Sequence, residues 1–99
     1  MVIEMIVTTT NDISGKRIVE YKGIVFGEVF YSPDAGWVKL TIIKNYEDAL
    51  IKSKELALDK MKENALKIGA NAIVGASFVF NYIGHSVSVS ATGTAVVVE

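Results

Sequence analysis

Few side chains in this sequence could take part in chemistry. The chain has one histidine, His85, and no cysteine. Zinc sites usually combine several nitrogen or sulfur ligands. A metal site built on His85 would therefore need carboxylates, water or copies of His85 from other subunits. We interpret His85 as a solvent-exposed turn residue and keep it as a candidate metal ligand.

Glu28 is the carboxylate with the most unusual surroundings. It lies between Gly27 and Val29 in a strongly apolar segment. If buried there, it would need a partner, and Lys16, Arg17 or Lys22 could pair with it across an interface between copies. Structural ion pairing is favoured over a general-base role, and Glu28 is the second candidate metal ligand.

No arrangement of residues indicates catalysis, and we predict no catalytic residues. Ser86 follows His85 directly, and adjacent residues of a strand point to opposite faces, so the two are poorly placed as a nucleophile and its base. Neither glycine-rich phosphate-binding pattern occurs. We interpret the chain as a binding or structural protein rather than an enzyme. A resident cofactor is not indicated beyond a metal ion at His85 or Glu28.

Aromatic side chains gather near the end of an apolar segment. Phe78, Phe80 and Tyr82 alternate, so they share one face of a strand. Core packing or a seam between subunits explains them better than RNA recognition, which would require two helices and a basic flank. Together with Trp37 they are the candidate residues of a small-ligand pocket between subunits.

Composition excludes several classes of partner. The net charge is −1, so no basic surplus is available for nucleic acid. No apolar stretch is long enough to span a membrane, and residues 1–5 lack the basic region of a signal peptide. We expect one cytoplasmic domain over residues 1–99. Hydrophobic residues make up 51% of this short chain without disulfides, which indicates burial against further copies of itself.

The clearest predicted element is a helix over residues 45–68. Asn45 is a plausible N-cap, and Gly69 is a natural stop. Small and apolar residues recur every three or four positions, which predicts one buried face. This face comprises Tyr46, Ala49, Leu50, Ser53, Ala57, Met61, Ala65 and Ile68.

Strands are predicted on both sides of this helix. Residues 1–10 and 17–31 would form a hairpin, in which Gly23 and Gly27 mark a bulge or a close backbone approach. Residues 71–83 read as a strand buried on both faces, and 86–98 as a strand that alternates apolar and hydroxyl residues. Residues 37–43 read as an extended segment or the start of a short helix, and we favour the extended form.

These elements predict an α+β fold. A small antiparallel or mixed sheet of four or five strands, in the order β-β-(β)-α-β-β, carries one long helix on one face. A single helix covers one face only, so another copy of the chain is the natural cover for the other.

Four blocks of the sequence resemble the YbjQ-like family. They are IVTTT at 6–10, GKRIVEYKGIVFGEV at 15–29, LKIGANAIVG at 66–75 and VSATGTAV at 89–96. Together they extend over nearly the whole chain in the right order. Members of this family are small proteins of uncharacterised function, often labelled as heavy-metal-binding.

The resemblance implies a dodecin-like subunit in a ring that is usually a pentamer. It also implies the alternative function of heavy-metal binding or metal response. Between Phe30 and Tyr46 the chain is shorter than its relatives, so no role is carried over for that segment. The family offers no catalytic residues to transfer.

Overall fold

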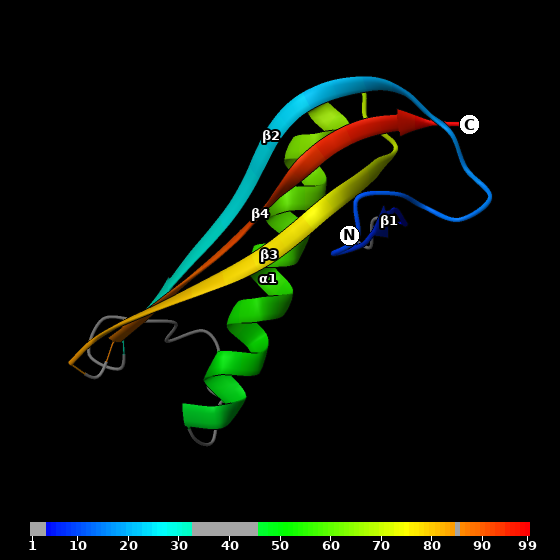
Figure 1. Ribbon diagram of the computed structural model, residues 1–99. Coiled ribbons are helices and arrows are strands. Elements are labelled where there is room, and N and C mark those ends of the chain that lie inside the picture. The colour runs from blue at the N-terminus through cyan, green and yellow to red at the C-terminus, as the bar shows by residue number, and fades with distance from the viewer. Residues whose placement is uncertain (1–3, 33–45, 85) are drawn as a thin grey trace.

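The computed structural model describes residues 4–32, 46–84 and 86–99. Five elements follow one another along the chain: β1 (Ile6–Val7), β2 (Ile18–Tyr31), α1 (Tyr46–Lys67), β3 (Ala72–Ile83) and β4 (Ser86–Val98). One sheet and one helix form two layers, with α1 on a single face of the sheet (Figure 1). The predicted α+β class and element order are confirmed. The possible strand at 37–43 and the residues Trp37 and His85 lie outside the described residues.

The sheet is mixed, with the strand order β1-β3-β4-β2. β4 lies in the middle and pairs antiparallel with both β2 and β3, while β1 pairs parallel with β3. The predicted hairpin between the first two strands is therefore wrong. β2 and β4 are both long and pair along most of their length, whereas only Ile6 and Val7 of the first segment form a ladder.

The helix buries the face that its periodicity predicted. Ala49, Ser53, Ala57, Met61 and Ala65 have no exposed surface. The helix ends before Gly69, whose φ of 83° is in the left-handed region that favours glycine. Ile68 was predicted in the buried face but lies beyond the helix end and is 41% exposed.

Gly27 sets how closely α1 approaches β2. A Cβ atom at this position would lie 2.0 Å from the Ala57 carbonyl oxygen and 2.5 Å from the Met61 backbone nitrogen. Gly23, by contrast, has a φ of 124° and lies at a register shift between β2 and β4. The two glycines thus fulfil the two predicted roles separately, Gly27 as a close approach and Gly23 as a bulge.

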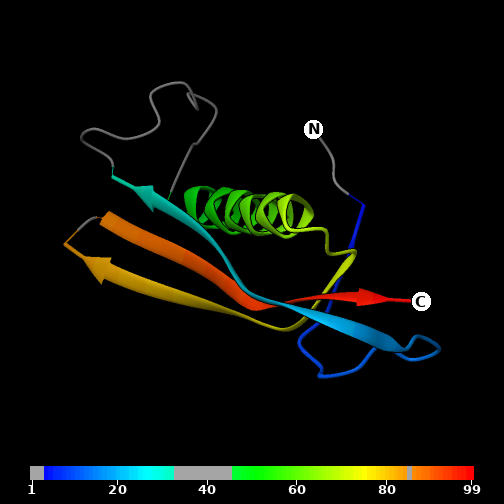
Figure 2. The same ribbon diagram turned by 90° about the horizontal axis from the view of Figure 1, so that it is seen from above.

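A second, smaller cluster lies on the face of the sheet opposite the helix. It joins Ala72, Val74, Val96 and Val98, with Ile13 and Ile18 packed against them. The segment before β2 therefore covers this end of the sheet (Figure 2). Asn71 fastens the same end, because its side chain donates to the Val98 carbonyl at 3.0 Å and accepts from the Val98 amide at 2.8 Å.

Burial divides β3 into two halves. Ala72, Ile73, Val74 and Ala76 are buried, whereas residues 77–82 are all exposed. The predicted burial of this strand on both faces is correct for its first half and wrong for its second half within a single chain. Helix and loop cover only the first half.

Candidate functional site

The exposed half of β3 presents three aromatic side chains on one face, which we call the aromatic row: Phe78, Phe80 and Tyr82. They are 38%, 36% and 59% exposed. In the ladder with β4 they lie opposite Ala91, Val89 and Val87. Directly opposed residues share a face, and those three β4 residues belong to the core beneath α1. The aromatic row is therefore on the helix side of the sheet and continues the face formed by these β4 residues.

The row is exposed because α1 does not reach it. The helix packs mainly on β2 and β4 and makes little contact with β3. Figure 1 shows that sheet and helix diverge toward the end of β3, where the row lies. The aromatic row is thus only partly covered on the helix side of the sheet.

The outer edge of this half of β3 is also open among the described residues. The N-terminal segment forms backbone hydrogen bonds with this edge only as far as Ala76. In the last of them the Ala76 amide donates to the Thr8 carbonyl at 3.0 Å. In the ranges 4–32, 46–84 and 86–99, no strand pairs with β3 on that side beyond Ile73. An edge of this kind can accept a further strand.

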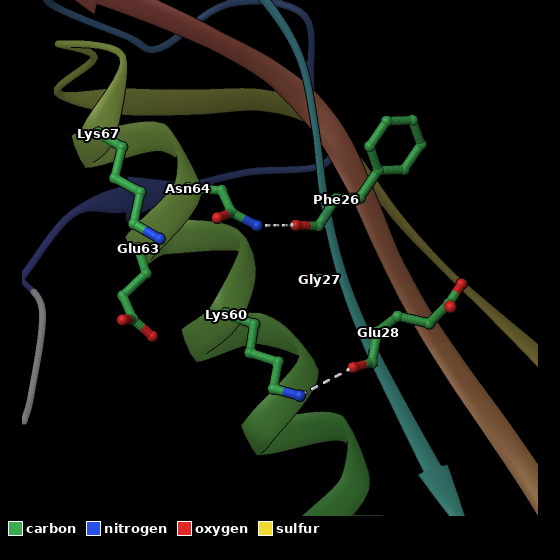
Figure 3. Close-up of a pocket in the computed structure, with 7 residues that line it drawn as sticks. All are labelled: Phe26, Gly27, Glu28, Lys60, Glu63, Asn64 and Lys67. Atoms are coloured by element: carbon green, nitrogen blue, oxygen red, sulfur yellow. Dashed lines mark hydrogen bonds between the residues drawn. The ribbon is translucent and has the colours of Figure 1, made fainter.

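A second exposed apolar surface, which was not predicted from the sequence, lies on β2. We call it the outer stripe: Ile24, Phe26 and Phe30, which are 70%, 58% and 58% exposed. Val25 and Val29 between them belong to the core beneath α1, so alternation places the stripe on the opposite face. Figure 3 shows the Phe26 ring directed away from α1. The signal in the sequence was that both alternating sets of this segment are apolar.

Glu28 lies within the outer stripe and is exposed rather than buried. Its carboxylate accepts a hydrogen bond from the Ser90 hydroxyl at 3.0 Å. Lys22, which was considered as its partner, forms an ion pair with Glu20 at 3.0 Å in the same chain. Among the described residues no three His, Asp or Glu side chains gather as metal ligands. The structure thus places Glu28 in an apolar surface and not in a metal cluster.

The helix closes the edge of β2 with its own side chains. Asn64 Nδ2 donates to the Phe26 carbonyl at 2.7 Å, and Lys60 Nζ donates to the Glu28 carbonyl at 3.2 Å (Figure 3). Between these contacts is a shallow hollow of about 330 Å³, which Glu63 and Lys67 also line. Because Asn64 and Lys60, its nearest donors, already bind carbonyls of β2, we interpret this hollow as part of the packing contact between α1 and β2 and not as a ligand site.

The described part of the chain contains no helix with the length and apolar character of a membrane span. Fold and site together define a small two-layer α+β protein whose sheet exposes apolar side chains on both faces.

The chain belongs to the YbjQ-like family, because residues 5–99 match the family model described as "Putative heavy-metal-binding". It is 46% identical to a UPF0145 protein of Acetivibrio thermocellus, an alignment that covers 96% of this chain and 100% of that one. A UPF0145 protein of Clostridium kluyveri is 45% identical with the same coverage. The predicted family membership is confirmed.

A solved structure shares the fold. It is a protein of unknown function from Pediococcus pentosaceus, assigned to the DUF74 family, with a TM-score of 0.58 and 17% sequence identity. The match covers 96% of this chain and 98% of the other. At this identity the likeness concerns the arrangement of helix and strands.

Proposed function

We propose that the chain is a subunit of a homo-oligomeric ring that binds a small apolar or partly apolar ligand between its subunits. The exposed aromatic row is the observation that carries this proposal. Aromatic side chains supply large contact areas and can stack on a planar ligand. Pockets for small molecules commonly form where subunits meet, lined by such side chains with a few polar groups.

The amount of exposed apolar surface supports assembly. Besides the aromatic row, the outer stripe and Val79 are exposed on the sheet, on a chain of only 99 residues. Burying such side chains against another copy is favourable by about 25 cal/mol per Å² of apolar surface. Five subunits is the number that the family resemblance implies.

Native mass spectrometry of the metal-free protein tests this function. We expect a multiple of the 10.7 kDa chain mass, with additional mass from a retained small molecule. Denaturing mass spectrometry of the same sample would then identify the released compound. A monomer throughout the micromolar range would contradict the proposal. A ring that neither retains nor binds a small molecule would support the homo-oligomer and contradict the ligand site.

The family description favours heavy-metal binding as the second candidate. With the ligands available in the described residues, such a site would have to draw carboxylates from several subunits, for example Glu28 of each copy. Titration calorimetry with Zn²⁺ on the wild type and on Glu28→Gln tests this, with Glu63→Gln as the matched control. Equal binding by all three proteins would exclude Glu28 as a ligand.

A further inference from the structure

Two apolar surfaces of the chain lie on opposite faces and opposite sides of the sheet. The aromatic row is on β3, on the face that carries α1, and the outer stripe is on β2, on the other face. β4 lies between the two strands. A pair of copies related by a twofold axis would bury one surface twice and leave the other exposed, whereas a head-to-tail contact buries both kinds of surface.

The two surfaces also lie at the same position along the strand direction, which we call their height. Through β4, Phe78 is level with Gly27, and Phe80 is level with Val29. The outer stripe spans residues 24–30 and so overlaps this height. A neighbouring copy can therefore place its stripe on the row by a displacement perpendicular to the strands, without a shift along them. Head-to-tail contacts give a ring where the rotation between neighbours closes, and an open helical filament where it does not.

A strand packed on the aromatic row would need one layer of space above the sheet. Packed sheets are separated by about 10 Å, which is also the usual thickness of a core layer. A neighbour's β2 with its stripe facing the aromatic row would lie in the layer of α1, next to the helix. The neighbour's own helix is on the far side of that strand, because Phe26 points away from α1 (Figure 3).

The carboxylate of the stripe can meet an opposite charge on α1 beside the row. The stripe carries one carboxylate, Glu28, which is exposed. On α1, Lys54 and Lys60 are three residues before and after Ala57, which places them about 60° to either side of it around the helix. Ala57 meets β2 at Gly27, and Lys60 lies on the side of the β2 edge, so Lys54 lies on the other flank, toward β4 and β3. It is one turn before Ala57, whose carbonyl lies against Gly27 at the height of Phe78.

We infer that the aromatic row of one subunit packs against the outer stripe of the next copy of the same chain, with Glu28 of that copy near Lys54. This inference rests on the proposed homo-oligomer and specifies its interface. Each subunit uses both surfaces once, so the contact is head-to-tail around the ring. A ligand between subunits would then be held by the row on one side and by the stripe on the other.

Mixing two variants tests the inference. Phe80→Asp disables the row and leaves the stripe, while Phe26→Asp disables the stripe and leaves the row. Both side chains are exposed, so each variant is expected to retain its fold by circular dichroism. Sedimentation should show each variant alone as a monomer and the equimolar mixture as a 1:1 dimer, because one intact row meets one intact stripe.

Leu66→Asp is the matched control, since Leu66 is 47% exposed on α1 outside both surfaces. It should assemble as the wild type does. The inference is wrong if either variant still dimerises alone, if the mixture yields no mixed species, or if Leu66→Asp dissociates equally. A wild type that is itself monomeric would instead refute the proposed homo-oligomer, so the two failures can be told apart.

Discussion

The two halves of β3 have similar apolar character and opposite surroundings. Residues 72–76 have α1 on one face, Ile13 and Ile18 on the other and the N-terminal segment along the edge. Residues 77–82 pair only with β4 among the described residues, and all six are exposed. We call these the covered half and the open half. The difference teaches that apolar composition predicts that a strand will be covered, but not by what.

Breaking the contact between α1 and β2 should have one of the largest effects. Gly27→Ala places a methyl group against the backbone of Ala57 and Met61, so α1 must move away from β2. We expect a loss of about 3 kcal/mol in the free energy of unfolding, measured with urea.

Gly93→Ala is the control for Gly27→Ala. Its added Cβ would lie 2.5 Å from Cγ2 of the buried Ile73 and 3.4 Å from the Val74 carbonyl oxygen, so it clashes with one side chain rather than with two backbone atoms. Its cost should be about 1 to 2 kcal/mol. Equal costs for the two variants would show that the helix–strand contact is not the tightest point of the fold.

A comparison of Met61→Ala with Tyr82→Ala contrasts the two environments directly. Met61 is fully buried, so its truncation should cost about 3 kcal/mol at any protein concentration. Tyr82 is 59% exposed, and its truncation should cost about 0.5 kcal/mol or less in dilute protein.

Protein concentration sharpens this second prediction. If another copy covers the open half, the cost of Tyr82→Ala must grow as the concentration rises, because assembly stabilises the folded chain by mass action. A cost of Tyr82→Ala that stays constant over a wide range of concentrations would argue against that cover.

Asn71 should have an intermediate effect, because it fastens β4 at the covered end through two hydrogen bonds to Val98. Asn71→Ala removes both and should cost about 2 kcal/mol. Asn71→Asp keeps the acceptor and loses the donor, so thermal melts should place it between Asn71→Ala and the wild type. An Asp variant as unstable as the Ala variant would show that the donated bond dominates.

The smallest effect is expected for the ion pair between Arg17 and Glu99. Both side chains are largely exposed, and the two backbones already exchange hydrogen bonds of 3.0 Å. Glu99→Gln should change the free energy of unfolding by about 0.5 kcal/mol or less, and less at high salt. A larger loss would mean that this pair helps to hold the covered end together.

Much of the candidate site followed from local pattern. Alternation placed Phe78, Phe80 and Tyr82 on one face, and the structure agrees. The same alternation in β2 contained the outer stripe, but a pattern of apolar residues on both faces does not tell which neighbours meet them. Glu28 was considered in a buried setting, whereas it is exposed, because no element crosses the outer face of β2 at that height among the described residues.

Local sequence was enough to predict the helix, the three long strands and the positions of the special glycines, because these depend on periodicity and on backbone conformations of single residues. Only the tertiary structure decided that β1 pairs with β3 instead of β2, and that α1 lies over β2 and β4. Both depend on contacts between residues far apart in the chain. Hydrogen-bonding groups are the same at every strand edge, so local sequence does not specify which edges pair. The aromatic row is exposed for this reason: the register of the sheet and the course of α1 leave it largely uncovered by the elements that the structure describes.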